Sequence, residues 1–159
     1  MISRRLVLGG GLAAGFGLSA PPAAKAAATF EIVHSDAEWR RLLTSQQYGV
    51  LRQNGTEAPF SSALLQEHRP GVFTCAGCAR DLFSSTTKYD SHTGWPSFWA
   101  PLDKAVDTRR DTSFGMVRTA VECAGCGGHL GHVFNDGPQP TGLRYCMNGI
   151  ALGFKAASA

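Results

Sequence analysis

The chain has 159 residues, five cysteines and a formal net charge of +3 at neutral pH. This length suits one domain with one modest hydrophobic core. Three of the 15 basic residues, Arg4, Arg5 and Lys25, lie near the N-terminus without an acidic neighbour. The 12 basic residues that follow are balanced by 12 acidic residues, which argues against a nucleic-acid-binding protein.

The first 26 residues have the layout of an export signal. A basic start at Arg4-Arg5 precedes an apolar stretch from Leu6 to Ala20, and Ala24-Lys25-Ala26 is a cleavage signal of the A-x-A type. The apolar stretch is shorter than the roughly 18 residues of a comfortable membrane span. With "SRRLVL" it favours a twin-arginine signal over an ordinary secretion leader or a retained anchor. We therefore expect an exported domain at 27–159, located in a bacterial periplasm, with no stable membrane association after cleavage.

Residues 35–54 are expected to be helical. Ser35-Asp-Ala-Glu38 is a capping box, in which the first and fourth side chains bond reciprocally to backbone N–H groups. Thr44-Ser-Gln-Gln47 is a second capping box, and Gly55 closes the helical part. These helices carry no obvious chemistry, and we interpret them as cover for one side of the core.

From residue 71 onward the sequence predicts short antiparallel strands. The segments "GVFTC", "RDLFSS", "GHVFND" and "GLRYCMNGIALGF" carry β-branched and aromatic residues between turn-forming ones. "FGMVRTAVEC" alternates as a half-buried strand does. "NDGPQPTG" at 135–142 must be a loop, because it holds two prolines and two glycines. The expected fold is mainly β: a small antiparallel domain of two facing, β-tent-like sheets with short N-terminal helices.

Two identical "CAGC" tetrapeptides predict one tetrahedral metal site. Two C-x-x-C units supply four thiolate ligands, which select zinc or iron, and zinc is the commoner structural ion. The 44 residues between the units imply that the metal clips two distant loops together, and Gly77 and Gly125 are expected to allow the tight turns. Two redox-active pairs or two structural disulfides are the alternatives. The predicted ligands of a structural Zn²⁺ are Cys75, Cys78, Cys123 and Cys126.

The fifth cysteine, Cys146 in "LRYCMNG", needs its own explanation. A lone cysteine is often a small buried hydrophobe. Here Arg144 lies two residues before it and Asn148 two residues after it, and "GGHLGHVF" supplies two histidines. A cation and an imidazole near a thiol lower its pKa and make it reactive. Solvated loop histidines and a surface arginine are the alternatives.

Longer motifs resemble the B-type methionine sulfoxide reductases. They are "KYDSHTGWPSFWAPL" (88–102), "GGHLGHVFNDGP" (127–138) and "GLRYCMNGIALGF" (142–154), together with "GTEAPF" (55–60) and both CAGC units. The resemblance spans residues 35–154. It implies the reduction of methionine-R-sulfoxide, free or in oxidised proteins, to methionine, with Cys146 as nucleophile and a Cys146 sulfenic acid as intermediate.

The same resemblance assigns the other site residues. Arg144 and Asn148 match positions that line the site, and His129 and His132 match active-site histidines. An imidazole can protonate the departing oxygen at neutral pH, and we favour His132 as the donor. Trp95 in "GWPSF" matches the residue that packs on the substrate methyl group. The other tryptophans, Trp39 and Trp99, are expected in the core.

The sequence departs from the family pattern at one position. Many members carry a second redox cysteine just before "GWPSF", where this chain has Thr93. The sulfenic acid would therefore need an external reductant, either a thioredoxin-like protein or a small thiol. A non-catalytic zinc-clipped binding module and a thiol–disulfide oxidoreductase are the competing hypotheses.

Overall fold

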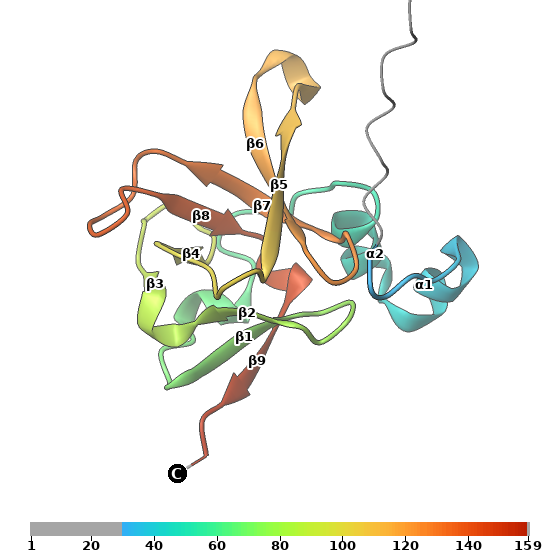
Figure 1. Cartoon of the computed structure of the whole chain (residues 1–159), viewed down its shortest axis with the longest axis horizontal. Coiled ribbons are helices and arrows are strands. Elements are labelled where there is room, and N and C mark those ends of the chain that lie inside the picture. Colours follow the sequence, from blue (N-terminus) through green and yellow to red (C-terminus); the bar gives the residue numbers. More distant parts are fainter. Residues whose placement is uncertain (1–29, 159) are drawn as a thin grey trace, which may run out of the picture.

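The computed structural model describes residues 30–158 (Figure 1). The predicted export signal at 1–26, and with it the domain boundary, lies outside this range. The α-helices and β-strands, in chain order, are α1 (Asp36–Leu42), α2 (Ser45–Leu51), β1 (Gly71–Cys75), β2 (Asp81–Ser84), β3 (Lys88–Tyr89), β4 (Ser97–Phe98), β5 (Val106–Asp111), β6 (Arg118–Cys123), β7 (His129–Phe134), β8 (Arg144–Met147) and β9 (Leu152–Ala156). Short 3₁₀ turns cover Ala63–Gln66, Ser85–Thr87, Ser113–Gly115 and Gly149–Ala151.

Both predicted capping boxes are confirmed. Ser35 accepts a hydrogen bond from the Glu38 backbone N–H, and the Glu38 side chain accepts one from Ser35 in return. Thr44 and Gln47 make the same reciprocal pair at the start of α2. Each box satisfies two N–H groups that a helix start leaves unpaired. The predicted helical stretch thus forms two helices with one break between them.

The strands form two antiparallel sheets, which confirms the predicted fold class. One sheet has the strand order β2-β1-β9, and the other has the order β3-β4-β8-β7-β6-β5. In Figure 1 the smaller sheet lies below the larger one, and the two helices lie to one side. The pairing of β1 with β9 joins the early and late parts of the chain.

Aromatic side chains fill the space between the sheets. Phe98 of the larger sheet stacks on Phe83 of the smaller sheet, with ring centroids 4.4 Å apart, and meets the edge of Phe73 at 5.0 Å. All three side chains are fully buried. Trp39 of α1 is also buried in this core, as predicted. Trp99 is only partly buried and lies outside the core cluster, so the core prediction for it is wrong.

The predicted strand at 114–123 begins later than expected. Residues 112–117 form the exposed turn of the β5–β6 hairpin, which projects from the body of the molecule (Figure 1). Phe114 has a φ of 56° in this turn, a left-handed conformation that a strand cannot contain. β6 therefore starts at Arg118. The loop predicted at 135–142 is confirmed.

Across residues 30–158, none of the helices has both the length and the apolar character needed to cross a bilayer.

Candidate active site and metal centre

The four CAGC cysteines come together as one cluster. Their sulfur atoms lie within 4.8 Å of one another, with Cys75 Sγ 3.7 Å from Cys126 Sγ and Cys78 Sγ 3.5 Å from Cys123 Sγ. Four sulfurs held about 2.3 Å from one zinc ion stand about 3.8 Å apart along the edges of a tetrahedron. The donor set and its spacing therefore fit one tetrahedral ion. All five cysteines are free thiols, so the two-disulfide alternative is not the arrangement present.

The turn that makes each C-x-x-C unit depends on the residue after its second cysteine. Ala79 has a φ of 60° and Gly127 a φ of 67°, and each donates its N–H to the first cysteine's carbonyl at 2.8 Å. Gly77 and Gly125, predicted to permit these turns, do not have a left-handed φ. The conformational demand thus lies at positions 79 and 127.

The cluster joins the two sheets. Cys75 is the last residue of β1 in the smaller sheet, and Cys123 is the last residue of β6 in the larger one. The second unit forms the turn between β6 and β7. An ion bound here ties the ends of both sheets together, as the spacing of the two units predicted.

Cys146 lies on the face of the larger sheet that points away from the core. Its neighbours along β8, Tyr145 and Met147, pack in or against the core, so the alternation of a strand turns Cys146 outward. Cys146 pairs directly with Ser97 of β4 on one side and with His132 of β7 on the other. Directly opposed residues of antiparallel strands share a face, and their Cβ atoms are about 5 Å apart. The sheet register therefore brings the thiol and an imidazole together.

The thiol of Cys146 is half-buried, and this changes its expected acidity. Burial raises its pKa, while the hydroxyl of Thr93 at 3.8 Å, the charge of Arg144 and the hydroxyl of Ser97 act in the opposite direction. The net shift is upward, so the lowered pKa expected from the sequence is wrong for the free protein. The surrounding donors offset part of the cost of burying a thiolate.

Arg144 lies beside Cys146 and is held in place by the adjoining loop. Its guanidinium makes a two-pronged ion pair with Asp136, at 2.9 and 2.8 Å, and covers the ring of Phe134 at 4.4 Å. The Asp136 carboxylate raises the pKa of Arg144, and Arg144 lowers the pKa of Asp136. Arg144 is thus a fixed positive charge near the sulfur rather than a solvated surface cation.

A β-bulge at Leu130 turns both histidines to the side of Cys146. Residues three apart in a regular strand point to opposite faces. Here Gly131 pairs with Val121 but His129 pairs with Glu122, so Leu130 is the extra residue. His129 and His132 consequently share one face, and their ring centroids are 5.2 Å apart.

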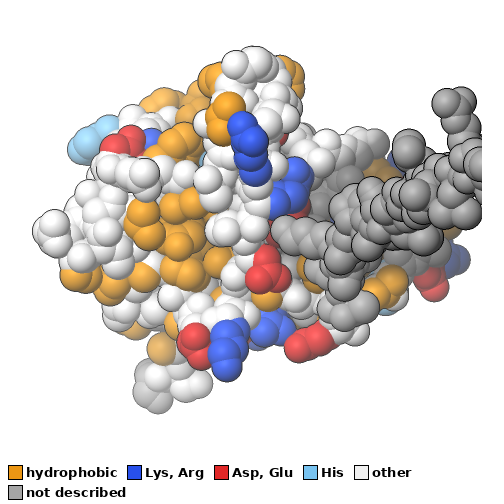
Figure 2. All heavy atoms as spheres, turned by 45° about the horizontal axis from the view of Figure 1, so that its top comes forward, with side chains coloured by type: hydrophobic (Ala, Val, Ile, Leu, Met, Phe, Trp, Pro, Cys, Tyr) orange, Lys and Arg blue, Asp and Glu red, His pale blue; other side chains and the backbone are white. Residues whose placement is uncertain are grey.

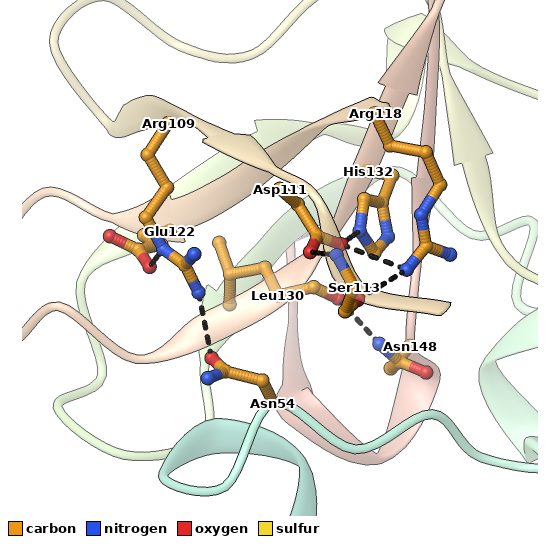
Figure 3. A network of polar contacts seen from close by, with 9 residues as sticks. All are labelled: Asn54, Arg109, Asp111, Ser113, Arg118, Glu122, Leu130, His132 and Asn148. Atoms are coloured by element: carbon orange, nitrogen blue, oxygen red, sulfur yellow. Dashed lines mark hydrogen bonds and ion pairs between the residues drawn. The ribbon is translucent and has the colours of Figure 1, made fainter. Parts of the chain in front are cut away.

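The two histidines have different surroundings. His132 is bonded through Nε2 to Asp111 at 2.8 Å, and Asp111 is paired with Arg118 at 2.8 Å (Figure 3). Burial lowers the pKa of His132, and the hydrogen bond to Asp111 raises it in part. Burial lowers the pKa of His129 to about 4, and neither ring nitrogen of His129 has a partner among the described residues. His129 is therefore neutral at physiological pH.

Glu57 connects three parts of the site. Its backbone carbonyl accepts a hydrogen bond from the Trp95 indole at 3.1 Å, and its N–H donates to Asn148 Oδ1 at 3.0 Å. Its carboxylate accepts the N–H groups of Gly149 and Ile150. The Asn148 amide also donates to the carbonyl of Leu130, the bulge residue, at 3.0 Å (Figure 3). Asn148 lies just beyond the end of β8, and its amide is engaged by the backbone rather than left free.

Sequence reasoning assigned no role to Glu57, Asp111 or Asp136. Glu57 and Asp136 lie inside motifs noted in the sequence, where a carboxylate within an otherwise apolar or turn-forming stretch is a usable signal. Asp111 gave no such signal, because its contact with His132 depends on how three strands align. The structure brings Cys146, His132, His129 and Arg144 to one face, with Trp95 and Asn148 joined through Glu57.

An open cavity lies next to this face. It has a volume of about 430 Å³ and is lined by Tyr89, Asp90, Ser91, Thr93, Asp136, Gly137, Pro138 and Arg144. Two of these, Thr93 and Arg144, are among the residues that lower the pKa of the Cys146 thiol against the effect of burial. On the face shown in Figure 2, basic and acidic side chains are interspersed, and apolar side chains form a patch beside the projecting hairpin. The coloured side chains in this view form no charged patch of a single sign.

Comparison with known proteins gives a consistent result. The model of the SelR domain matches residues 43–156. The chain is 54% identical over 127 residues to the peptide methionine sulfoxide reductase MsrB of Leptospira interrogans, covering 79% of this chain and 97% of that protein. It is 56% identical to the MsrB proteins of Leifsonia xyli, covering 79% of this chain and 92% of that protein, and of Pseudomonas putida, covering 74% and 90%. The chain therefore belongs to the SelR-domain family of MsrB peptide methionine sulfoxide reductases.

Proposed function

We propose that the protein reduces the R-epimer of methionine sulfoxide, in oxidised proteins or free, through a Cys146 sulfenic acid. The supporting observation is the direct pairing of Cys146 with His132 on the face that points away from the core. A nucleophile opposite an acid–base group fits a reaction in which one sulfur is attacked while an oxygen is protonated. The names of the relatives supply the substrate class.

The chemistry balances with these residues. The Cys146 thiolate attacks the sulfoxide sulfur, and His132 in its imidazolium form protonates the oxygen. The oxygen is transferred to Cys146, methionine is released and the cysteine becomes a sulfenic acid. Arg144 stabilises the thiolate, and Trp95 offers an apolar surface for the substrate methyl group. The sulfoxide is reduced by two electrons, and the cysteine sulfur is oxidised by two.

The reductant is external to the chain. One thiol attacks the sulfenic acid to give a mixed disulfide and water, and a second thiol releases Cys146 and forms a new disulfide. The cavity lined by Thr93 and Arg144 offers an approach for such a thiol. A thioredoxin-like protein or a small-molecule thiol supplies the electrons.

We further propose that the cysteine cluster holds one structural Zn²⁺. The four soft donors and their tetrahedral spacing support this choice of ion. The ion holds the ends of the two sheets and takes no part in the reduction. The basic and apolar pattern of residues 1–26 supports export by the twin-arginine route to a bacterial periplasm, where the protein repairs oxidised proteins.

Two competing hypotheses receive less support. A thiol–disulfide oxidoreductase needs a redox-active CAGC pair, but all four sulfurs gather in one cluster. The similar proteins are named as reductases, and this does not support a non-catalytic zinc-clipped binding module.

The decisive experiment is Cys146→Ser. This variant loses turnover of methionine-R-sulfoxide by at least 1,000-fold, on the order expected for loss of a covalent nucleophile. Its metal content and melting temperature stay those of the wild type. Tyr145→Phe, one residue away on the opposite face, is the matched control and keeps its activity. Residual turnover in Cys146→Ser, or equal rates for the R- and S-epimers, contradicts the proposal.

A further inference from the structure

Asp111 and His132 meet although their strands are not neighbours. Asp111 ends β5, His132 lies on β7, and β6 runs between them. Strands two places apart in a sheet are separated by about 10 Å. The residue of β6 that pairs with His132 is Ala120, whose methyl group leaves the space above β6 open. Asp111 Oδ2 therefore reaches across β6 to within 2.8 Å of His132 Nε2 (Figure 3).

Two further contacts fix the Asp111 carboxylate. Arg118 Nη2 donates to Oδ2 at 2.8 Å, and the backbone N–H of Ser113 donates to Oδ1 at 2.9 Å. Arg118 also reaches the Ser113 hydroxyl at 3.2 Å, so the start of the hairpin turn braces the ion pair. The Asp111 side chain is 13% exposed and that of His132 is 11% exposed. Water and salt therefore screen this contact less than they screen a surface pair.

The contact determines which ring nitrogen of His132 carries a proton. The Ser113 N–H, together with His132, holds the pKa of Asp111 well below its usual range, so Asp111 is an acceptor at working pH. Nε2 must then be the donor. In the neutral ring Nδ1 is bare, and only the imidazolium carries a proton there.

We propose that Asp111 is a positioning residue for the reduction: its carboxylate holds the His132 ring by Nε2–H, so the proton given to the sulfoxide oxygen leaves from Nδ1. This inference rests on the proposed function with His132 as the proton donor. Asp111 does not touch the reacting atoms in this arrangement. It acts by selecting one protonation pattern of the ring that does.

The Asp111 carboxylate raises the pKa of His132 against the effects of burial and of nearby positive charges. The charged groups that act on His132 are Asp111 and Arg109 of β5 and Arg118 of β6, and Arg109 is itself paired with Glu122 of β6. The titratable neighbours of His132 on the same face are His129 of β7 and Cys146 of β8. Burial and the two arginines of the hairpin lower the pKa of His132, and Asp111 raises it. Without Asp111 the imidazolium would be a smaller fraction of the enzyme.

The effect of Asp111 on the rate depends on how Cys146 and His132 share one titratable proton. The reactive form is Cys146 thiolate with His132 imidazolium, which has the same number of protons as thiol with neutral imidazole. Because the pKa of Cys146 is raised and that of His132 is lowered, the reactive form is the minor one. A further decrease in the pKa of His132, as expected on loss of the adjacent negative charge, lowers kcat/KM between the two limbs, on the order of tenfold. It also moves the acidic limb to lower pH.

Asp111→Asn tests the inference, and Asp107→Asn is the matched control. Asp107 lies on the same strand but is exposed, so the control makes the same charge change away from His132. We expect the kcat/KM plateau to fall about tenfold and the acidic limb to move in Asp111→Asn only. An unchanged profile in Asp111→Asn, or an equal change in Asp107→Asn, overturns the inference.

Nitrogen-15 NMR of the imidazole rings tests the inference without catalysis. The wild-type protein is expected to show His132 as the Nε2–H form at neutral pH, with a higher pKa than in Asp111→Asn. A His132 ring protonated at Nδ1 in the neutral state overturns the inference even if no variant folds. If the wild type shows the expected ring form but reduces no sulfoxide, the proposed function fails and the Asp111–His132 arrangement stands.

Discussion

At the scale of single residues, Thr93 is as informative as Cys146. Thr93 Oγ1 lies 3.8 Å from Cys146 Sγ and 2.8 Å from the hydroxyl of Ser91, which in turn contacts Ser97 at 2.7 Å. A short series of hydroxyl groups thus leads to the thiol at the position where many relatives place a second cysteine. The side chain at position 93 lies next to the thiol, but it carries a hydroxyl in place of a second sulfur.

Thr93→Cys is therefore expected to create an internal resolving thiol. An Sγ at position 93 would lie near the present hydroxyl, within reach of the 2.05 Å bond that a disulfide requires. One equivalent of methionine sulfoxide should convert this variant to a disulfide between residues 93 and 146, with two thiols lost in a titration. The wild type should instead lose one thiol and give a sulfenic acid or mixed-thiol adduct by mass spectrometry.

Ser91→Cys is the control for this prediction. Ser91 lies in the same loop, but its hydroxyl contacts Thr93 and Ser97 rather than the thiol. It should not form the disulfide at the first turnover. A Thr93→Cys protein that still gives only an external adduct would show that the loop holds the two side chains apart.

At the scale of elements, the two C-x-x-C units form the same kind of turn. They differ in the residue after the second cysteine, which has a left-handed φ in both. Ala79 and Gly127 both adopt a left-handed φ. Only glycine takes this conformation without a steric cost, which is roughly 1–2 kcal/mol for other L-residues. The first unit therefore carries a local strain that the second avoids.

Ala79→Gly should stabilise the folded protein by up to about 1 kcal/mol, because relief of the strain exceeds the added entropy of the unfolded chain. Gly127→Ala is the reciprocal variant and should destabilise the protein by more than about 1 kcal/mol. Its new Cβ would also collide with the ring of Phe30. Thermal unfolding at equal metal content measures both effects, and a drop in stability for Ala79→Gly would contradict the argument.

The elements also show which features the sequence can predict. Both helix starts were predictable because a capping box is local. The strands at 71–75, 129–134, 144–147 and 152–156 lie in segments whose β-branched and aromatic residues stand between turn-forming ones. The bulge at Leu130 was not predictable, since it appears only when β6 and β7 are aligned. The misplaced start of β6 has a similar cause: the alternation in "FGMV" continues into a turn that Phe114 forms with a left-handed backbone.

At the scale of the whole molecule, the cysteine cluster joins two sheets that otherwise meet through the aromatic and aliphatic side chains of the core. Its four sulfurs come from the end of β1 and the turn after it, and from the end of β6 and the β6–β7 turn, while Cys146 and His132 lie on β8 and β7. β7 begins just after the second C-x-x-C unit and carries both histidines. We therefore expect an ion bound by the cysteine cluster to help hold the histidines in position.

Removal of the metal is expected to unfold the domain. Structural zinc contributes on the order of 10 kcal/mol to folding, which is comparable to the total stability of a typical domain. The purified protein should contain one equivalent of zinc, and a strong chelator should abolish its cooperative thermal transition. Zinc added afterwards should restore both the transition and the activity. A chelated protein with an unchanged melting temperature would argue against a structural ion.

Much of the site follows from the sequence, and its electrostatics do not. The ligand set was predictable because four cysteines repeat one spacing, and the resemblance named Cys146, His132 and Arg144 as one site. The upward shift in the pKa of Cys146 could not be predicted, because it depends on how deeply the strand is buried. The ion pair of Arg144 with Asp136 and the contact of His132 with Asp111 likewise depend on loops and strands that meet only in the folded chain.

The hydroxyl at position 93 also bears on the lifetime of the protein under oxidative stress. With the proposed chemistry, each turnover leaves Cys146 as a sulfenic acid, and Thr93 cannot trap it as a disulfide. One equivalent of peroxide converts an unprotected sulfenic acid to a sulfinic acid, which ordinary thiols do not reduce. The repair capacity of each molecule is then set by a race between thiol and oxidant, and a compartment that runs short of thiols would inactivate its own repair enzyme.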